Sequence, residues 1–444
     1  MSSSEILIKN AIVLTMDDHV GDFDRADVLI RSGAIARIAP DIGDVAGAEA
    51  VDASGCIVIP GLVDSHRHLW HTVLRNLLAD VPLSRFFRAI GPLCAEFTPD
   101  DLYVSTLLGA AECLNAGITT VLDWCHCAAT PAHADEALRA IFKSGARAVF
   151  AYGAPLCAAP GAPHPEDIIR VQRDYFAKSG SLVSLAMAAR GPEMMSAEQN
   201  DAEFELARRL GIPISLHTGA TPNATGASIA ALHARGQGGG DINYVHLNYT
   251  DGAVLDLIAK NGGTASITPY VETVMGAGAP PTEALLSRGV TTSLGTDTAL
   301  WGASNLFTEM RMCLSAARIV EERAHVAAQS QFQKIAFRAE RALSLATRES
   351  AAAIWLDRIV GSLTPGKRAD LVLIDRRSLG ALPVKTVSQA RNAIVMGCEA
   401  GDVRSVMVDG AWVKRDGALR GIDLEDLGDR AERIRQRLAP NQVE

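Results

Sequence analysis

Residues that bind metal ions recur in this sequence at the ends of short apolar runs. Five of them stand at such ends: His66, His68, His217, His246 and Asp297. His66 and His68 are separated by one residue, so in an extended segment both imidazoles point to the same side and can bind one ion. A third imidazole and a carboxylate would complete a site that suits Zn²⁺, with Fe²⁺ and Mn²⁺ as competitors.

A site of this composition is catalytic when one coordination position is left to water. The metal lowers the pKa of that water toward neutrality, supplies hydroxide at physiological pH and polarises the atom under attack. Unrelated core or surface histidines would not be expected to gather at the ends of several strands together with an aspartate. The pattern therefore predicts a catalytic metal site.

The apolar runs themselves predict the architecture that positions these residues. Eight runs, separated by helix-like segments, read as strands: 57–64, 118–123, 146–152, 182–188, 212–217, 242–247, 264–268 and 290–296. Repeated strand–helix units form parallel sheets, and eight of them are most simply a (β/α)8 barrel of the TIM type. Reactive groups of such barrels lie at the carboxyl ends of the strands, which is where the five residues stand.

The two ends of the chain have a different pattern. Apolar and polar residues alternate over four segments, as in antiparallel strands: 6–16, 26–38, 369–375 and 403–414. We expect one small β-sandwich domain built from both termini, residues 1–57 and 361–444, around an α/β barrel at 58–360. A charged surface helix is expected at 423–437.

Charge and cysteine usage narrow the class of protein. The 444 residues include 42 Lys and Arg against 51 Asp and Glu, a net charge of −9, without basic blocks. We therefore expect a small-molecule substrate and no nucleic-acid or membrane partner. The eight cysteines form no CxxC pair, and the N-terminus lacks the pattern of a signal peptide, which favours the reducing cytoplasm. A homodimer is the default oligomer for such an enzyme.

Taken together, the motifs resemble the amidohydrolase superfamily, in the subgroup of cytosine, guanine and S-adenosylhomocysteine deaminases and triazine hydrolases. The resemblance spans nearly the whole chain. It rests on these segments: PGLVDSHRH (60–68), AGITTVLD (116–123), LHT (216–218), VH (245–246), SLGTD (293–297) followed by SN (304–305), and GSLTPGKRADLVLID (361–375).

The resemblance implies roles for the five residues. His66, His68, His217 and Asp297 match the ligands of one divalent metal, with zinc expected before iron or manganese. His246 matches the histidine that faces the substrate or the attacking water, and Asp297 would also take the proton from that water. Binuclear members carry a bridging lysine on strand four, but 182–190 contains none, so one metal is expected.

The chain departs from many deaminases of the subgroup at strand five. These relatives carry HxxE, whose glutamate moves the proton to the leaving nitrogen, whereas this chain reads His217-Thr218-Gly219-Ala220. Glu272, just after the seventh strand, is the replacement that the sequence offers. An exposed loop acid is the alternative interpretation of Glu272.

Six further residues follow strand ends and are candidates for substrate binding: Trp70, His71, His126, Tyr152, Arg190 and Trp301. Aromatic walls suit a flat ring, although Trp70 and Trp301 could equally be packing residues. Arg190 could clamp a carboxylate or a carbonyl of the substrate, or form a structural ion pair.

These observations favour deamination of a small N-heterocycle of the purine, pterin, pyrimidine or triazine type. A first alternative keeps the site and changes the bond to an amide, a cyclic amide, a carbamate or a carbon–halogen bond. A second takes the barrel as a binding protein without catalysis, because fold does not determine function. The ring, the native metal and the loop that covers the site stay open at this stage.

Overall fold

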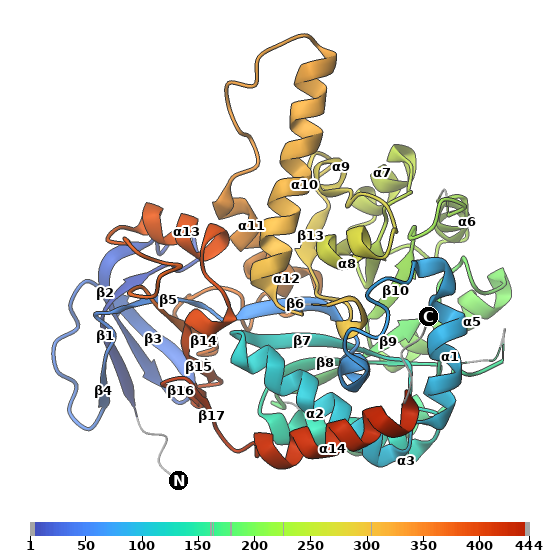
Figure 1. Cartoon of the computed structure of the whole chain (residues 1–444), viewed down its shortest axis with the longest axis horizontal. Helices are drawn as coiled ribbons and strands as arrows, with labels where there is room; N and C mark the ends of the chain where they lie inside the picture. Colours follow the sequence, from blue (N-terminus) through green and yellow to red (C-terminus); the bar gives the residue numbers. More distant parts are fainter. Residues whose placement is uncertain are drawn as a thin grey trace. The chain divides into compact units, whose positions relative to one another are not determined.

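The computed structural model describes residues 5–159, 162, 164–177, 180–224, 226–302 and 304–439. The chain forms two compact units (Figure 1). One comprises residues 1–64, 112–120 and 305–421, and the other comprises 65–111, 121–304 and 422–444. The domain boundaries expected at 57/58 and 360/361 remain a prediction.

An eight-stranded sheet follows chain order from β6 to β13. Its strands are β6 (Leu62–Arg67), β7 (Ile118–Cys125), β8 (Arg147–Gly153), β9 (Val183–Ala189), β10 (Ile214–Thr218), β11 (Ile242–His246), β12 (Thr264–Ile267) and β13 (Thr291–Leu294). The strand pairs from β8 to β13 are parallel. A parallel bridge between Arg67 and Asp297 brings the last strand back to the first, so the predicted (β/α)8 barrel is confirmed.

Helices alternate with these strands, as the pattern predicts. They are α1 (Phe86–Glu96), α2 (Pro99–Asn115), α3 (Pro131–Ser144), α4 (Asp167–Tyr175), α5 (Ala197–Leu210), α6 (Ala227–Ala234), α7 (Gly252–Lys260), α8 (Pro269–Val274) and α9 (Thr282–Leu286). Local sequence sets their ends. α5, for example, starts at a Ser196–Gln199 capping box and stops at Gly211, whose φ of +67° suits glycine.

A second, mixed sheet unites the two ends of the chain. Its nine strands are β1 (Ile6–Val13), β2 (Phe23–Arg31), β3 (Ala34–Ala39), β4 (Glu49–Asp52), β5 (Cys56–Pro60), β14 (Leu371–Asp375), β15 (Val403–Val408), β16 (Ala411–Arg415) and β17 (Ala418–Leu419). β5 pairs with β1 on one side and antiparallel with β14 on the other. The small β domain expected from both termini is therefore confirmed.

The core of this sheet explains why segments so far apart in sequence associate. Ile8, Val28, Val58, Leu371 and Met407 are completely buried in one cluster. Full burial of such a side chain contributes about 1.5–3 kcal/mol relative to exposure. The same unit holds α10 (Leu306–Ala327), α11 (Ala339–Leu345), α12 (Arg348–Ala353) and α13 (Val387–Met396).

The terminal helix α14 (Leu424–Leu438) belongs to the barrel unit and not to the unit of the small sheet. Asp423 caps its first turn, and Arg430 and Arg437 form ion pairs with Asp100 and Asp101 at the start of α2. The charged helix expected at 423–437 is thus present. In the described part of the chain, no helix is long and apolar enough to cross a membrane.

Candidate metal centre and active site

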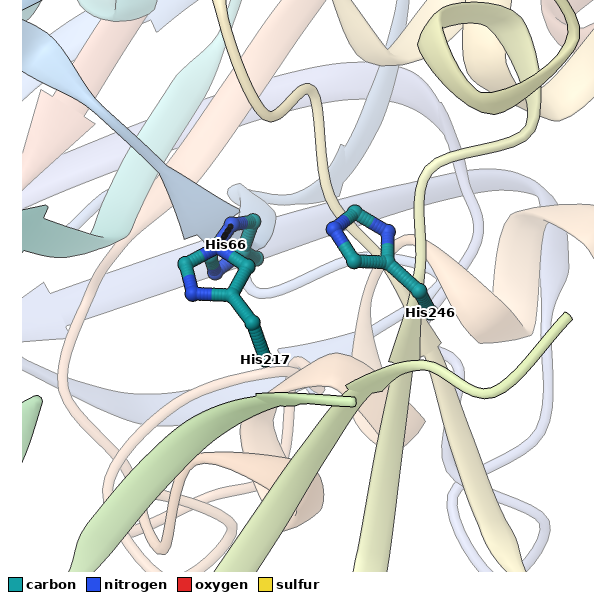
Figure 2. A group of neighbouring side chains, drawn as sticks. All are labelled: His66, His217 and His246. Atoms are coloured by element: carbon teal, nitrogen blue, oxygen red, sulfur yellow. Dashed lines mark hydrogen bonds between the residues drawn. The ribbon is translucent and has the colours of Figure 1, made fainter. Parts of the chain in front are cut away.

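The five metal-binding candidates meet at the carboxyl end of the barrel strands. His66 and His217 are the next-to-last residues of β6 and β10, His246 ends β11, and His68 and Asp297 follow β6 and β13. Figure 2 shows the rings of His66, His217 and His246 turned toward one another. Ligand atoms lie within 4.8 Å of one another in two overlapping groups: His66, His217 and His246, and His66, His68 and Asp297.

Three of the distances between these atoms fit neighbouring ligands of one metal ion. His66 Nε2 lies 3.1 Å from His217 Nε2, and Asp297 Oδ1 lies 3.3 Å from His68 Nε2 and 3.6 Å from His66 Nε2. A tetrahedron with metal–ligand bonds of about 2.05 Å has edges of about 3.3 Å. These three contacts suit one zinc-sized ion, but His217 falls outside the group formed by His66, His68 and Asp297, so the His217 ring must move toward that group to bind the same ion.

The protonation states also suit a metal. Burial lowers the pKa of His66, His68 and His217, which keeps these imidazoles in the neutral form that binds cations. His68 Nδ1 lies 2.7 Å from the carbonyl oxygen of Trp124, to which only a protonated nitrogen can donate. Its Nε2 is then the nitrogen with a free lone pair, and it faces Asp297.

Asp297 is the buried carboxylate of the cluster. Burial by itself raises the pKa of Asp297, but the hydrogen bond from His66 and the neighbouring imidazoles outweigh it and hold the pKa below its ordinary value. The main chain fixes the residue from both sides, because its N–H donates to His66 O and its carbonyl accepts from His68 N. The carboxylate is therefore ionised and well positioned.

Left-handed backbone conformations at His246 and Asp297 set the direction of these two side chains. In the β10–β11 register His217 pairs with Val245, and His246 pairs with Thr218. In regular strands His217 and His246 would therefore point to opposite faces of the sheet. His246 instead has φ +82° and Asp297 has φ +55°, a conformation that costs non-glycine residues about 1–3 kcal/mol and is typical of functional sites. This turn brings His246 to the cluster.

Gly295 allows β13 to approach β6 closely enough for this arrangement. A Cβ at Gly295 would lie 2.7 Å from His66 O and 2.9 Å from His66 Cβ. Both distances are shorter than non-bonded atoms tolerate, and the backbone of His66 cannot swing aside as a flexible side chain would. Glycine at this position is therefore required by the geometry of a predicted metal ligand.

We expect Gly295→Ala to lower the metal content of the purified protein and to reduce kcat/KM at least about tenfold, because misplaced catalytic groups lose rate steeply. Metal analysis and steady-state kinetics measure the two effects. Gly91→Ala is the matched control, because a Cβ at Gly91 would meet nothing within 4 Å. Full metal occupancy and activity in Gly295→Ala would show that β6 can shift without cost.

Glu272 lies at the start of α8 and is completely buried, so its interpretation as an exposed loop acid is wrong. One carboxylate oxygen contacts His246 Nδ1 at 3.1 Å and accepts from Thr268 N at 2.9 Å, and the other accepts from Asn248 Nδ2 at 3.0 Å. Burial lowers the pKa of His246, but Glu272 and Asp297 together raise it above its ordinary value. Glu272 thus holds the His246 ring through its Nδ1 atom.

The six substrate-binding candidates do not all lie at the metal cluster. His126 is near the cluster, with its ring centroid 4.4 Å from that of His68. Trp70 and Trp301 are buried, and their indole N–H groups donate to His126 Nδ1 and Val81 O. His71 is buried against Thr298, at 2.8 Å. These contacts favour packing roles for both tryptophans.

Tyr152 and Arg190 differ in the direction of their side chains. Tyr152 is buried and its hydroxyl donates to Asp167 on α4 at 3.3 Å, so it faces the helix layer instead of the cluster. The structure thus does not bring Tyr152 to the site. Arg190 follows β9 at the edge that carries the cluster, and its guanidinium contacts a carbonyl oxygen, that of Ala162, at 3.2 Å.

Trp124 is a site residue that the sequence reasoning missed. Its ring centroid lies 4.3 Å from that of His217 and 5.6 Å from that of His68. Its carbonyl also orients His68. Its place just before His126 in the WCHC segment was the available signal, because residues at the end of a barrel strand line the site. Trp124 therefore supplies the aromatic surface expected of Trp70 and Trp301.

Comparisons with known proteins agree with this geometry. The profile of the amidohydrolase family matches residues 57–413. A 5-methylthioadenosine/S-adenosylhomocysteine deaminase of Symbiobacterium thermophilum is 29% identical over 433 residues, which cover 93% of this chain and 94% of that protein. A 5'-deoxyadenosine deaminase of Methanosarcina mazei is 26% identical over 450 residues, 98% of each chain.

Solved structures show the same fold. An adenosine deaminase from Xanthomonas campestris with bound zinc superposes with a TM-score of 0.85 at 25% identity, covering 98% of this chain and 99% of that one. Atrazine chlorohydrolase from Arthrobacter aurescens in complex with zinc gives a TM-score of 0.82 at 21% identity over 97% and 99% of the chains. At that identity the second similarity concerns the fold alone.

Proposed function

The chain belongs to the amidohydrolase family, and from this premise we propose that it is a zinc-dependent deaminase of a small N-heterocycle. The observation that carries the proposal is the clustering of His66, His68, His217 and Asp297 at the carboxyl end of the barrel strands, with His66 Nε2 3.1 Å from His217 Nε2 and 3.6 Å from Asp297 Oδ1. The adenosine-type substrates named for the relatives support an aromatic amine as the group removed, with a purine ahead of pterin, pyrimidine and triazine rings.

In this proposal His66, His68, His217 and Asp297 hold a single zinc ion. When bound, the ion lowers the pKa of water and polarises the carbon under attack. Imidazole nitrogens and a carboxylate oxygen are donors that zinc binds, and water would occupy a fifth position beside the four side chains. The native metal and its number per chain are to be measured.

The chain's own residues would accept the proton of the attacking water and bind the substrate ring. Asp297 is ionised beside the cluster and would accept the proton of the attacking water. His246, held by Glu272, would face the reacting carbon with Nε2. The Trp124 ring and His126 would line the flat substrate, with His71, Trp70 and Trp301 packed around them.

We further propose a cytoplasmic homodimer that acts on a small molecule, without nucleic-acid or membrane partners. All eight cysteines are free thiols, which suits a reducing compartment. The net charge of −9 disfavours binding to nucleic acid or to an anionic membrane surface. Light scattering on the purified protein measures the oligomeric state.

The proposal is tested by elemental analysis of protein purified without chelators, followed by an ammonia-release screen over purines, pterins, pyrimidines and triazines. About one zinc per chain together with ammonia release is the expected result. Metal without ammonia from any ring would overturn the deaminase and move the search to amides, carbamates and carbon–halogen bonds. No metal retained, even after reconstitution, would favour a binding protein.

A further inference from the structure

Arg190 stands beside the metal cluster at the carboxyl edge of the barrel. β9 pairs in parallel with β10, and Ala189 lies opposite Leu216 in this register. The next two residues in register are Arg190 and His217. Paired residues of neighbouring parallel strands point to the same face of the sheet. The register therefore places Arg190 on the face that carries His217.

The guanidinium has one edge without a partner in the described chain. Its Nη1 donates to Ala162 O at 3.2 Å and contacts Met195 Sδ at 4.0 Å, and both residues lie in segments that follow barrel strands. Both contacts are made by Nη1, and Nε and Nη2 have no hydrogen-bond partner among the described residues. These two nitrogens present parallel N–H groups, the geometry that binds both oxygens of a carboxylate at once.

Among the described residues, no carboxylate forms an ion pair with the Arg190 guanidinium, whose contacts are a carbonyl oxygen and a sulfur. Burial lowers the pKa of His164, and the charge of Arg190 lowers it further, so this neighbouring ring is neutral at pH 7. Glu203 on α5 is the acid that responds to Arg190, but burial raises the pKa of Glu203 to about 7 and no ion pair forms between them within 4.0 Å. A partly buried cation without a counter-ion favours an anionic ligand.

Two further N–H groups belong to rings that lie near the metal cluster, those of His126 and Trp124. Trp70 Nε1 donates to His126 Nδ1 at 3.1 Å, so the proton of the His126 ring lies on Nε2. The longer contact of Nδ1 with Trp124 O, at 3.3 Å, would require the other tautomer and leave the Trp70 N–H without an acceptor. Trp124 Nε1 is buried and has no partner in the described chain.

From this arrangement we propose that the substrate is an N-heterocycle with a carboxylate attached to its ring, bound by the Nε–Nη2 edge of Arg190. The inference rests on the deaminase function proposed above and narrows its substrate class. The carboxylate compensates the charge of Arg190 and directs the opposite, amine-bearing edge of the ring toward the metal cluster. Arg190 is thereby a specificity-determining residue.

The experiment uses the zinc-loaded enzyme and matched pairs of probes that differ by one ring carboxylate: pterin with pterin-6-carboxylate, and cytosine with 5-carboxycytosine. Ammonia release and calorimetric binding are measured for each probe. In pterin-6-carboxylate the carboxylate and the amine lie on opposite edges, so we expect this probe to exceed pterin at least about tenfold in kcat/KM, mainly through KM, whereas 5-carboxycytosine, with the two groups on adjacent carbons, tests the orientation. Arg190→Gln should lower kcat/KM for pterin-6-carboxylate about 100-fold and change pterin less than about threefold.

Three further variants define the role of Arg190. Arg190→Lys keeps the charge without the paired N–H edge and should recover only part of the loss. Arg173→Gln removes an arginine that is 73% exposed on α4 and should behave as wild type. Glu203→Gln should leave the preference intact, whereas the same loss in Glu203→Gln and Arg190→Gln would overturn the proposal in favour of a structural pair.

Failure of this inference and failure of the deaminase function give different results. Ammonia release without a preference for either carboxylated probe, or equal losses for both members of a pair in Arg190→Gln, overturns the inference and leaves the deaminase standing. Carboxylate-dependent binding that Arg190→Gln abolishes, without ammonia from any probe, supports the inference and overturns the deaminase. No preference in either binding or turnover overturns the inference.

Discussion

Asp297→Ala is expected to lower kcat for ammonia release by about 10⁴-fold and to leave the purified protein with much less than one metal ion per chain. Asp297 contributes a carboxylate oxygen 3.3 Å from His68 Nε2 and 3.6 Å from His66 Nε2. Its removal takes away the anion that balances a divalent charge and the base that accepts a proton from water. Elemental analysis and steady-state kinetics measure the two losses separately.

Two variants sharpen this prediction. Asp297→Asn preserves the size of the side chain and removes its charge, so it should lose activity as strongly as the alanine variant while keeping the fold. Asp256→Ala removes an exposed aspartate on α7 that pairs with Arg288, and it should leave both metal and turnover unchanged. Activity within tenfold of wild type in Asp297→Ala would exclude Asp297 from both roles.

Glu272→Gln is expected to lower kcat about 10- to 100-fold while the metal stays bound and KM changes little, which is the usual cost of losing a group that orients a catalytic side chain. The carboxylate holds His246 Nδ1 at 3.1 Å and stabilises the protonated ring. Glutamine can replace the bond from Thr268 N, but it carries no charge. The measurements are metal content, kcat and KM for one substrate.

The same variant distinguishes two roles for Glu272. Loss of metal along with activity would mean that Glu272 organises the whole cluster, and full activity would remove it from the mechanism. Glu283→Gln, at an exposed glutamate of the neighbouring helix α9, is the matched control. Since both oxygens of Glu272 are engaged with His246, Thr268 and Asn248, we propose that it positions His246 and does not itself carry a proton to the leaving nitrogen.

Local sequence was sufficient to predict the barrel and the cluster. Strands of a parallel sheet are buried on both faces, so they appear as short apolar runs, and helices between them have a different period. Two histidines one residue apart must share a face of a strand, as His66 and His68 do. Residues at the carboxyl ends of barrel strands face one mouth, which accounts for the convergence of His217, His246 and Asp297 on them.

The partners of these residues depended on tertiary structure. Whether Tyr152 faces the cluster or α4, and whether Glu272 is exposed or buried behind His246, depends on how neighbouring strands and their loops are aligned. The left-handed turn at His246 also reverses the direction that regular alternation would give its side chain.

The sequence predicts local features better than contacts because the two depend on interactions of different range along the chain. Periodicity reports which residues share a face of one element, because it arises from backbone geometry a few residues long. A contact such as His66 with Asp297 or Trp70 with His126 joins residues far apart in the chain, and it is set by strand register and close packing. The sequence therefore predicted the fold and the cluster of candidate metal ligands, and only the tertiary structure decided what supports His246 and leaves an edge of Arg190 available.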